Sequence, residues 1–377
     1  MRTRLIVALL FALAPGAEGK IVVQPWGATA DGGRKANLYT LTNPSGMEVK
    51  ITNYGGIVVS IRVPDRDGKL ADVVQGFDSL ADYTSANYIG TNGHYGALIG
   101  RFANRIKGGR ITVEGKTYAL DPDPHGDADQ GGRMGYYRQV WNAAARNGAE
   151  PRLILTHADP DLYMGYPGTV RVRVSYTLRK NNVLAIDARA TTDKPTIVNI
   201  VSRNFFNLAG TGTIEGHLLQ VFADHFTPVD EGSAATGEIR AVAGTDFDFT
   251  KAAVIGPRLQ SRDPQVLHSK GIDNNFVLNG KAGRLRIAAR LSDPGSGRTL
   301  EVWTTQPGLQ VYTANYVHTQ AALAKHYAVH GALTLEAQHF PDSPNHANFP
   351  STELVPGKPF HEVTEYRFGT AKKQPAP

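Results

Sequence analysis

Two charged side chains lie inside apolar runs of the sequence and are the first candidates for chemistry. Arg203 is part of TIVNIVSRNFFNLAG, residues 196–210, and Glu336 is part of LTLEAQ, residues 333–338. An arginine keeps its charge in a protein, and a charge that is buried without a partner is costly. A carboxylate in an apolar strand is either paired with an arginine or tuned for proton transfer. These two residues therefore predict a buried ion pair or a site of proton transfer and charge stabilisation.

Three further stretches contain polar residues that a plain β-sandwich does not need. Asn104 and Arg105 follow an apolar run in GALIGRFANRIKGG, Asp273 precedes one in KGIDNNFVLNG, and Gln310 lies in QPGLQVYTANY. Each stretch taken alone favours a structural role, because most embedded charges in proteins are merely paired. The sequence has no phosphate-binding loop, dinucleotide fingerprint, nucleophile elbow or His-Glu-x-x-His motif.

The histidines do not form a metal-binding pattern. The chain has 12 of them, and none of their spacings is typical of a metal site. His339 and His346 flank FPDSPN, a composition typical of a loop. We therefore expect surface histidines there, and no bound metal.

The elements that must position these residues are strands. In TVRVRVSYTL, apolar Val170, Val172 and Val174 alternate with Arg171 and Arg173, the period of a strand with one solvated face. Similar runs recur at short spacing, separated by turn sequences such as NYGG, PDRDGK and DPGSG. No repeat and no flexible linker divides the chain. The pattern predicts one large all-β domain, an antiparallel sandwich.

Composition and charge exclude some classes of protein. The 377 residues are 41% hydrophobic and 20% charged, with a net charge of +6. Lysines and arginines are scattered rather than clustered, so nucleic acid is not an expected partner. The absence of cysteine excludes disulfides, a thiol nucleophile and thiolate metal sites.

The N-terminus predicts export. Residues 1–19, MRTRLIVALLFALAPGAEG, contain two arginines, an apolar run and a small-residue cleavage site. The apolar run is too short to span a bilayer. We expect cleavage of this signal peptide to leave Lys20 as the first mature residue, with no membrane attachment afterwards. An exported chain without cysteine suits a bacterial periplasm.

Many short stretches, taken together, resemble the aldose 1-epimerase (galactose mutarotase) family. They occur in the family's order over nearly the whole mature chain: NYGGIVVSIRVPDRDGKLADVVQGFDSLADY, IGRFANRI, QGGRMGYYRQVW, GYPG, NFFNLAG, FTPVDEG, TGEIRAVAGTDFDF, IDNNFVL, PGLQVYTANY, LTLEAQHFPDSPNHANFPSTELVPG and TEYRFG. The resemblance implies a single antiparallel β-supersandwich over residues 20–369 with a sugar cleft on one face. We expect residues 370–377 to be a disordered tail.

The resemblance also implies a reaction. Enzymes of this family interconvert the α and β anomers of a free aldose. A glutamate takes the proton of the anomeric hydroxyl, a histidine protonates the ring oxygen, the ring opens, and the steps reverse after rotation of the aldehyde. Such general acid–base catalysis needs two groups of opposite protonation beside one sugar and no metal or organic cofactor.

Five residues keep the type that the family has at their positions. Glu336 falls on the glutamate base and Asp273 on the aspartate that binds sugar hydroxyls. Asn104 and Arg105 fall on the sugar-binding Asn-Arg pair, and Gln310 falls on a binding glutamine. The resemblance thus implies that Glu336 is catalytic and that the other four residues bind the substrate.

Both family histidines are replaced. Gln130 stands where the family has the histidine of Leu-His-Gly-Gly, and Arg203 stands where it has the histidine that acts as acid. Glutamine donates a hydrogen bond but delivers no proton, and arginine has a pKa above about 12. Both residues can therefore only polarise the ring oxygen or stabilise negative charge. Such stabilisation is worth roughly 3–4 kcal/mol in known enzymes.

Four interpretations remain open. In the first, the protein is a working mutarotase, with His125 in DPDPHGDADQGG as a possible source of imidazole. In the second, Arg203 and Arg105 bind the carboxylate of a uronic acid or sugar acid, for anomer exchange or another proton-transfer isomerase or lyase reaction. In the third, the protein binds carbohydrate without turnover. In the fourth, Arg203 simply pairs with Glu336 or Asp273, which would depress the carboxylate pKa and weaken the base.

Overall fold

The computed structural model describes residues 19–29, 33–91, 93–316, 325 and 327–371. The predicted signal peptide, apart from Gly19, and most of the predicted tail lie outside the described residues. Nearly all regular structure is β-strand, and every pairing between named strands is antiparallel. The helices of the described part are too short to cross a lipid bilayer.

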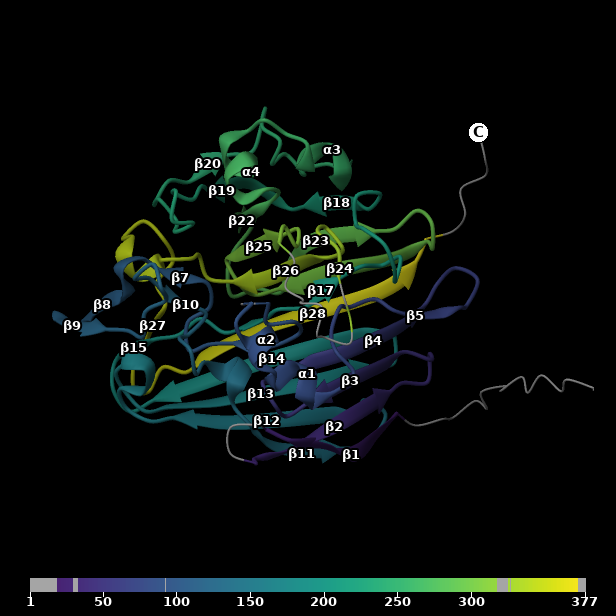
Figure 1. Ribbon diagram of the computed structural model, residues 1–377, viewed down its shortest axis with the longest axis horizontal. Helices are drawn as coiled ribbons and strands as arrows, with labels where there is room; N and C mark the ends of the chain where they lie inside the picture. Colours follow the sequence, from purple (N-terminus) through teal and green to yellow (C-terminus); the bar gives the residue numbers. More distant parts are fainter. Residues whose placement is uncertain (1–18, 30–32, 92, 317–324, 326, 372–377) are drawn as a thin grey trace, which may run out of the picture.

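The largest sheet has nine strands, which come from the middle and the end of the chain. Its order is β11 (Asn142–Arg146), β12 (Arg152–Asp159), β13 (Val170–Arg179), β14 (Val183–Thr192), β28 (Phe360–Thr370), β24 (Arg298–Thr304), β23 (Arg286–Ser292), β18 (Leu218–Val221) and β21 (Ala253–Val254). The long C-terminal strand β28 thus joins the two halves of this sheet, as Figure 1 shows in yellow.

Two smaller sheets complete the framework. The six-stranded sheet has the order β17 (Phe205–Phe206), β26 (Leu333–Gln338), β25 (Gly308–Tyr312), β22 (Asp273–Leu278), β19 (Ala223–Thr227) and β20 (Arg240–Ala241). The five-stranded sheet follows chain order: β1 (Lys20–Ala28), β2 (Lys35–Thr42), β3 (Glu48–Thr52), β4 (Val58–Pro64) and β5 (Leu70–Asp72).

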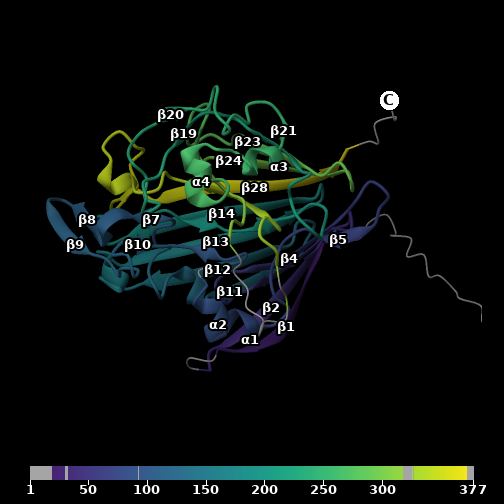
Figure 2. The same ribbon diagram turned by 45° about the horizontal axis from the view of Figure 1, so that its top comes forward.

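Short elements fill the connections. Two-stranded pairs are formed by β6 (Leu98–Ile99) with β16 (Val201–Ser202), β7 (Arg105–Ile106) with β10 (Ala128–Asp129), β8 (Arg110–Val113) with β9 (Lys116–Ala119), and β15 (Thr196–Ile197) with β27 (Glu353–Leu354). The α-helices are α1 (Leu80–Thr84), α2 (Ala86–Ile89), α3 (Ile255–Leu259) and α4 (Pro264–Ser269); single 3-10 turns are η1 (Lys107–Gly109), η2 (Tyr136–Arg138), η3 (Tyr163–Gly165) and η4 (Ser343–Asn345). The β8–β9 hairpin projects from one side of the molecule in both views (Figures 1 and 2).

One apolar core joins the three large sheets. Val172 and Val174 of β13, Ile51 of β3, Leu309 of β25 and Leu335 of β26 belong to the same buried cluster and are at most 2% exposed. Burial of each such side chain stabilises the fold by about 1.5–3 kcal/mol. The predicted alternation in TVRVRVSYTL is confirmed, because the valines face this core and the intervening arginines are exposed. The core therefore determines which face of each strand remains available for a binding or catalytic site.

A buried histidine predicts how stability depends on pH. His217 is 1% exposed, and its Nε2 accepts a hydrogen bond of 3.0 Å from the Leu208 amide, so the ring is neutral. Burial lowers the pKa of His217, although nearby Asp293 acts in the opposite direction. The unfolded chain, with a histidine pKa of about 6.5, therefore takes up a proton first as the pH falls. This contribution to stability is complete above pH about 6.5 and is lost below it.

We expect His217→Gln to flatten that dependence, because the glutamine oxygen keeps an acceptor and does not titrate. Urea unfolding at pH 7.5 and pH 5.5 measures the effect. The wild type should lose more unfolding free energy between the two pH values than the variant does. Equal losses in the two proteins would contradict the assignment. His125→Gln is the matched control, since that histidine is exposed and its imidazole makes no hydrogen bond to a described residue.

Candidate active site

Three neighbouring strands of the six-stranded sheet bring the predicted carboxylates and glutamine together. Gln310 of β25 lies directly opposite Glu336 of β26, and Asp273 of β22 lies opposite Tyr312, two residues beyond Gln310. Residues two apart in a strand share a face, so these side chains lie on one side of the sheet. Gln310 Nε2 donates to Asp273 Oδ1 at 2.7 Å. The intervening Leu335 faces the apolar core, so the polar side chains face away from it.

Arg203 is held by its backbone just beyond β16. Its carbonyl accepts from the Gly96 amide at 2.8 Å, and its own amide donates to the Ala97 carbonyl at 2.9 Å. Gly96 has φ of +69°, and a Cβ there would lie 2.1 Å from the Val58 carbonyl oxygen, so only glycine permits this close approach. The HYGALIG stretch thus fixes the arginine that replaces a family histidine.

The guanidinium of Arg203 lies between aromatic rings and the Glu336 carboxylate. Its Cζ is 5.3 Å from the ring centroids of both Phe205 and Tyr312, which is within cation–π range. Its Nη1 donates to Glu336 Oε1 at 2.6 Å, and the side chains of Arg203 and Glu336 are 10% and 2% exposed. The ion pair that the sequence left as one interpretation is therefore present.

The ion pair uses only some of the polar atoms of Arg203 and Glu336. Glu336 Oε1 accepts from Arg203 Nη1 and also from the Thr334 hydroxyl at 2.7 Å. Among the described residues nothing donates to Glu336 Oε2, and nothing accepts from Arg203 Nη2; neither atom is one of the fully buried unpaired atoms. One carboxylate oxygen and one guanidinium nitrogen are thus left for a ligand.

Burial dominates the proton affinity of both carboxyl groups. It raises the pKa of Glu336 above its usual value, although Arg203 and Thr334 act in the opposite direction. It also raises the pKa of Asp273, against the pull of Arg105 and Arg203. Pairing with Arg203 lowers the Glu336 pKa, as expected from the sequence, but desolvation of the carboxylate outweighs the ion pair and the net shift is upward. A higher pKa makes Glu336 a stronger base.

A second segment supplies Asn104, Arg105 and Gln130. Strands β7 and β10 pair so that Arg105 lies opposite Asp129, and Gln130 follows directly. The Gln130 amide donates to the Asn104 carbonyl at 3.0 Å, and Gln130 Oε1 accepts from the Asn104 amide at 2.9 Å. Both residues have left-handed backbone, with φ of 62° and 50°. With Oε1 turned toward the backbone, Gln130 Nε2 has no acceptor among the described residues.

Electrostatics link this segment to the carboxylates on the sheet. Burial favours the neutral form of Arg105, but the carboxylates of Asp129 and Asp273 outweigh it and raise its pKa. Burial likewise disfavours the charge on Arg203, and Glu336, Tyr312 and Asp273 outweigh it. The structure therefore brings the predicted residues into one group, which we call the polar cluster: Asn104, Arg105, Gln130, Arg203, Asp273, Gln310 and Glu336.

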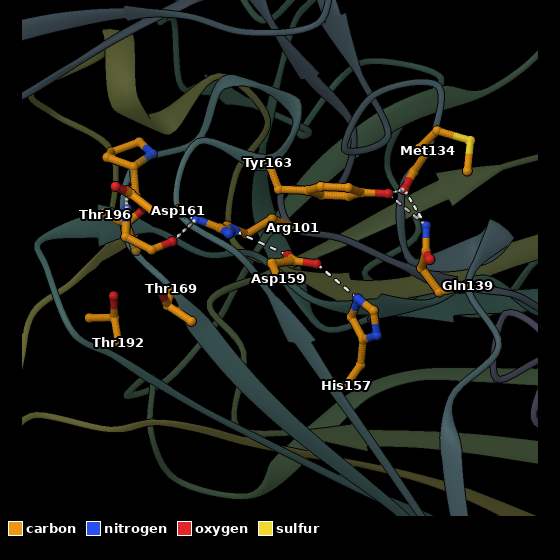
Figure 3. Close-up of polar contacts among 12 residues, drawn as sticks. Arg101, Met134, Gln139, His157, Asp159, Asp161, Tyr163, Thr169, Thr192 and Thr196 are labelled. Carbon is orange, nitrogen blue, oxygen red and sulfur yellow. Dashed lines mark hydrogen bonds and ion pairs between the residues drawn. The ribbon is translucent and has the colours of Figure 1, made fainter.

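Figure 3 shows a network of polar contacts around Arg101, Asp159 and His157. Arg101, three residues before Asn104, is 2% exposed; its Nε donates to Asp159 Oδ2 at 3.2 Å and its Nη1 to the Pro167 carbonyl at 2.8 Å. His157 Nε2 lies 3.0 Å from the other Asp159 oxygen. The same view shows Gln139 and the Tyr163 hydroxyl bonded to the Met134 carbonyl, in the loop that follows Gln130.

The histidines considered from the sequence lie elsewhere. His125 is exposed, and its imidazole makes no hydrogen bond to a described residue. His339 is half-buried, and burial lowers its pKa to about 4, so it is only partly the surface histidine that the sequence predicts. His346 Nε2 lies 3.1 Å from Asp342 Oδ2. In the part of the chain that the structure describes, no group of three or more potential ligands is arranged to hold a metal ion.

Sequence reasoning missed three contributors. Thr334 donates to Glu336, Asp129 lies opposite Arg105, and Gln338 Nε2 lies 3.5 Å from Gln310 Oε1. The alternation in LTLEAQ was the available signal for two of them, because Thr334 and Gln338 share the face of Glu336. No comparable signal identifies Asp129, whose partner comes from β7.

Comparison with known proteins decides the family. The family model described as aldose 1-epimerase matches residues 37–367. The chain belongs to the aldose 1-epimerase family. Galactose mutarotase of Bos taurus is 37% identical over 330 residues, 86% of this chain and 92% of the relative. Aldose 1-epimerase of Escherichia coli K12 is 35% identical over 346 residues, 90% of this chain and 97% of the relative.

A solved structure agrees with this assignment. The galactose 1-epimerase of Lactobacillus acidophilus is 28% identical, superposes with a TM-score of 0.82, and is matched over 93% of this chain and 100% of its own. The predicted fold, an all-β galactose-mutarotase-like sandwich in a single domain, is thereby confirmed. So is the predicted class of activity, an aldose 1-epimerase-type isomerase that interconverts the anomers of a free sugar.

Proposed function

We propose that this aldose 1-epimerase acts on a neutral free aldose and uses the Arg203–Glu336 pair in place of the family's glutamate and histidine. The observation that carries the proposal is that the ion pair uses only some of the polar atoms of each side chain. One end of Arg203 and one oxygen of Glu336 hold each other, while Arg203 Nη2 and Glu336 Oε2 are left unpaired among the described residues. A base and a charge-stabilising donor are thus fixed side by side.

In the proposed reaction, Glu336 Oε2 takes the proton of the anomeric hydroxyl. The bond between the anomeric carbon and the ring oxygen breaks, and its electron pair stays on the ring oxygen. Arg203 Nη2 and Gln130 Nε2 donate hydrogen bonds to that oxygen, which takes its proton from water. Rotation of the aldehyde and reversal of the steps give the other anomer. Asn104, Arg105, Asp273 and Gln310 hold the sugar hydroxyls.

The charge balance favours a neutral sugar over a uronic acid. Arg203 is already paired with Glu336, and Arg105 lies beside Asp129 and Asp273. The cluster therefore contains no excess positive charge for a carboxylate, and an added anion would meet the carboxylates already present. We accordingly place an acidic substrate second, and non-catalytic sugar binding third.

Anomer exchange measured by NMR tests the proposal. We expect freshly dissolved α-galactose or α-glucose to equilibrate faster with enzyme than in buffer, and galacturonate to show a smaller gain. A larger gain with galacturonate would assign the acidic substrate instead. Sugar binding by calorimetry with no gain on any sugar would leave a carbohydrate-binding protein.

Arg203→His restores the family's acid, and we expect it to change the pH profile. An imidazole on the ring oxygen must be protonated to act, so the variant should lose activity as the pH rises through about 6.5. The wild type, whose arginine does not titrate, should show no such alkaline limb. Anomer exchange measured from pH 5 to pH 9 gives both profiles. Identical profiles would show that residue 203 does not act on the ring oxygen.

We also propose that the chain is exported and cleaved after Gly19, as the charge, apolar run and small residues of its N-terminus support. Intact mass spectrometry of protein recovered from the periplasm of an expressing bacterium tests this. A mature chain that begins at Lys20 is the expected result, and an uncleaved chain in the cytoplasm would contradict it.

A further inference from the structure

A groove of about 440 Å³ lies on the nine-stranded sheet, over β11 to β14, and involves none of the polar cluster. Its polar lining includes Asn142, Thr156, Arg171, Arg173, Arg189 and Thr191. Two of its arginines come from TVRVRVSYTL, whose exposed charges the reaction does not use. Its volume is within the range of sites that bind small molecules.

The groove has an excess of positive charge. Arg171 and Arg173 form no ion pair or hydrogen bond with any described residue, and both are exposed. Arg189 Nε donates to Asp187 Oδ1 at 3.0 Å, but His361 lies 2.9 Å from the other oxygen of the same aspartate. No acidic side chain lines the groove. This is the reverse of the polar cluster, where each arginine lies beside carboxylates.

The strand register concentrates these charges. Arg173 lies directly opposite Arg189, and Arg171, two residues along β13, lies opposite Thr191. Like charges directly opposite each other destabilise a sheet, and a bound anion relieves that repulsion. Two residues along a strand span about 6.6 Å, so the three guanidinium groups can engage more than one anionic group at once. Arginine's planar fork matches carboxylates well.

The groove and the polar cluster lie on opposite sides of the core. Val172 of β13 and Leu335 of β26 both belong to the buried apolar cluster, whereas Arg171 and Arg173 point away from it on one side and Glu336 on the other. A ligand in the groove therefore leaves the catalytic residues accessible.

We propose that this groove is a second binding site, for an oligosaccharide of uronic acids. Carboxylates would pair with Arg171, Arg173 and Arg189, and sugar hydroxyls would bond to Thr156, Thr191 and Asn142. The lining has no phenylalanine, tyrosine or tryptophan on which nucleic acid bases could stack, which favours a saccharide. The site holds the enzyme on an acidic glycan while the polar cluster acts on free sugar.

Calorimetric titration of the full chain with oligogalacturonate tests the site, with saturating galactose present to occupy the polar cluster. We expect Arg171→Gln/Arg173→Gln to weaken binding at least about tenfold, because two charge-assisted contacts are lost. Arg262→Gln/Arg284→Gln removes the same charge from exposed positions elsewhere and should bind like the wild type. Anomer exchange on α-galactose should be unchanged in both variants, which shows that each is folded.

Three results would overturn the proposal. The first is no binding of oligogalacturonate by the wild type. The second is equal weakening in the two double variants, which would mean a general charge effect. The third is equal binding of a single-stranded oligonucleotide of the same charge, which would mean a site for polyanions of any kind. Because binding is the readout, its failure is distinct from failure of the proposed reaction.

Discussion

Glu336→Gln should reduce the rate of anomer exchange by about 10²–10⁴-fold, the usual contribution of a positioned proton-transfer group. The amide keeps the size of the side chain and still accepts from Arg203 and Thr334, but it cannot take the proton of the anomeric hydroxyl. We expect the sugar to bind nearly as before, so the loss should fall on kcat rather than KM. NMR exchange rates and calorimetric titration with galactose separate the two effects.

Glu353→Gln is the matched control, because that glutamate is exposed on β27. It should exchange anomers at the wild-type rate. If Glu336→Gln retained wild-type activity, Glu336 would not be the base and another group would have to take the proton. A loss of sugar binding together with a lower unfolding temperature would show that the removed charge had disrupted the site.

The pH dependence gives an independent check on the same residue. Burial raises the pKa of Glu336, so wild-type activity should fall on the acid side at a pH above the usual range for a glutamate. Removal of the neighbouring charge in Arg203→Met should raise that pKa further and move the acid limb to higher pH. An acid limb that stays in place would mean that the pair is not formed in the active enzyme.

Arg101→Leu should lower the free energy of unfolding by about 3–5 kcal/mol, which is the typical cost of leaving one partner of a buried ion pair uncompensated. Asp159 is 1% exposed, and leucine offers it no hydrogen bond. The Pro167 and Gly168 carbonyls, which Arg101 Nη1 bonds at 2.8 and 3.1 Å, would lose their donor as well. Urea unfolding at pH 7 measures the change.

The double variant Arg101→Leu/Asp159→Leu should be less destabilised than Arg101→Leu alone, because it leaves no buried charge. Arg110→Leu, at an exposed position of β8, should change the unfolding free energy by less than about 0.5 kcal/mol. A loss from Arg101→Leu no larger than that of Arg110→Leu would show that the network in Figure 3 adds no stability.

The resemblance to the aldose 1-epimerase family predicted most of the site, whereas the pattern along single strands only placed individual residues on strands. The position of Glu336 in an apolar run already indicated a carboxylate on a strand, and the structure places it on the polar face of β26. The same reasoning located Gln310. Single-strand patterns do not give the register between strands, however. The opposition of Gln310 and Glu336 is set by the β25–β26 pairing, and it becomes visible only in the assembled sheet.

The sequence left other features open for physical reasons. Contact of Arg203 with Glu336 was one interpretation among several, because residues 133 positions apart meet only through the fold. Whether the pKa of Glu336 is raised or lowered depends on the balance between burial, which raises it, and the ion pair with Arg203, which lowers it. Side-chain types alone do not give that balance. The α-helices in the described part of the chain have four to six residues, too few for a helical period to appear in the sequence.

The backbone clamp on Arg203 has a consequence for folding. Arg203 is fixed by Gly96 and Ala97, whereas Glu336 belongs to a strand more than 130 residues later. Such distant contacts close large loops and form late in folding. During refolding, sheet content should therefore recover before enzyme activity does. Activity in this chain thus reports that the segment of Arg203 and the much later strand of Glu336 have come together.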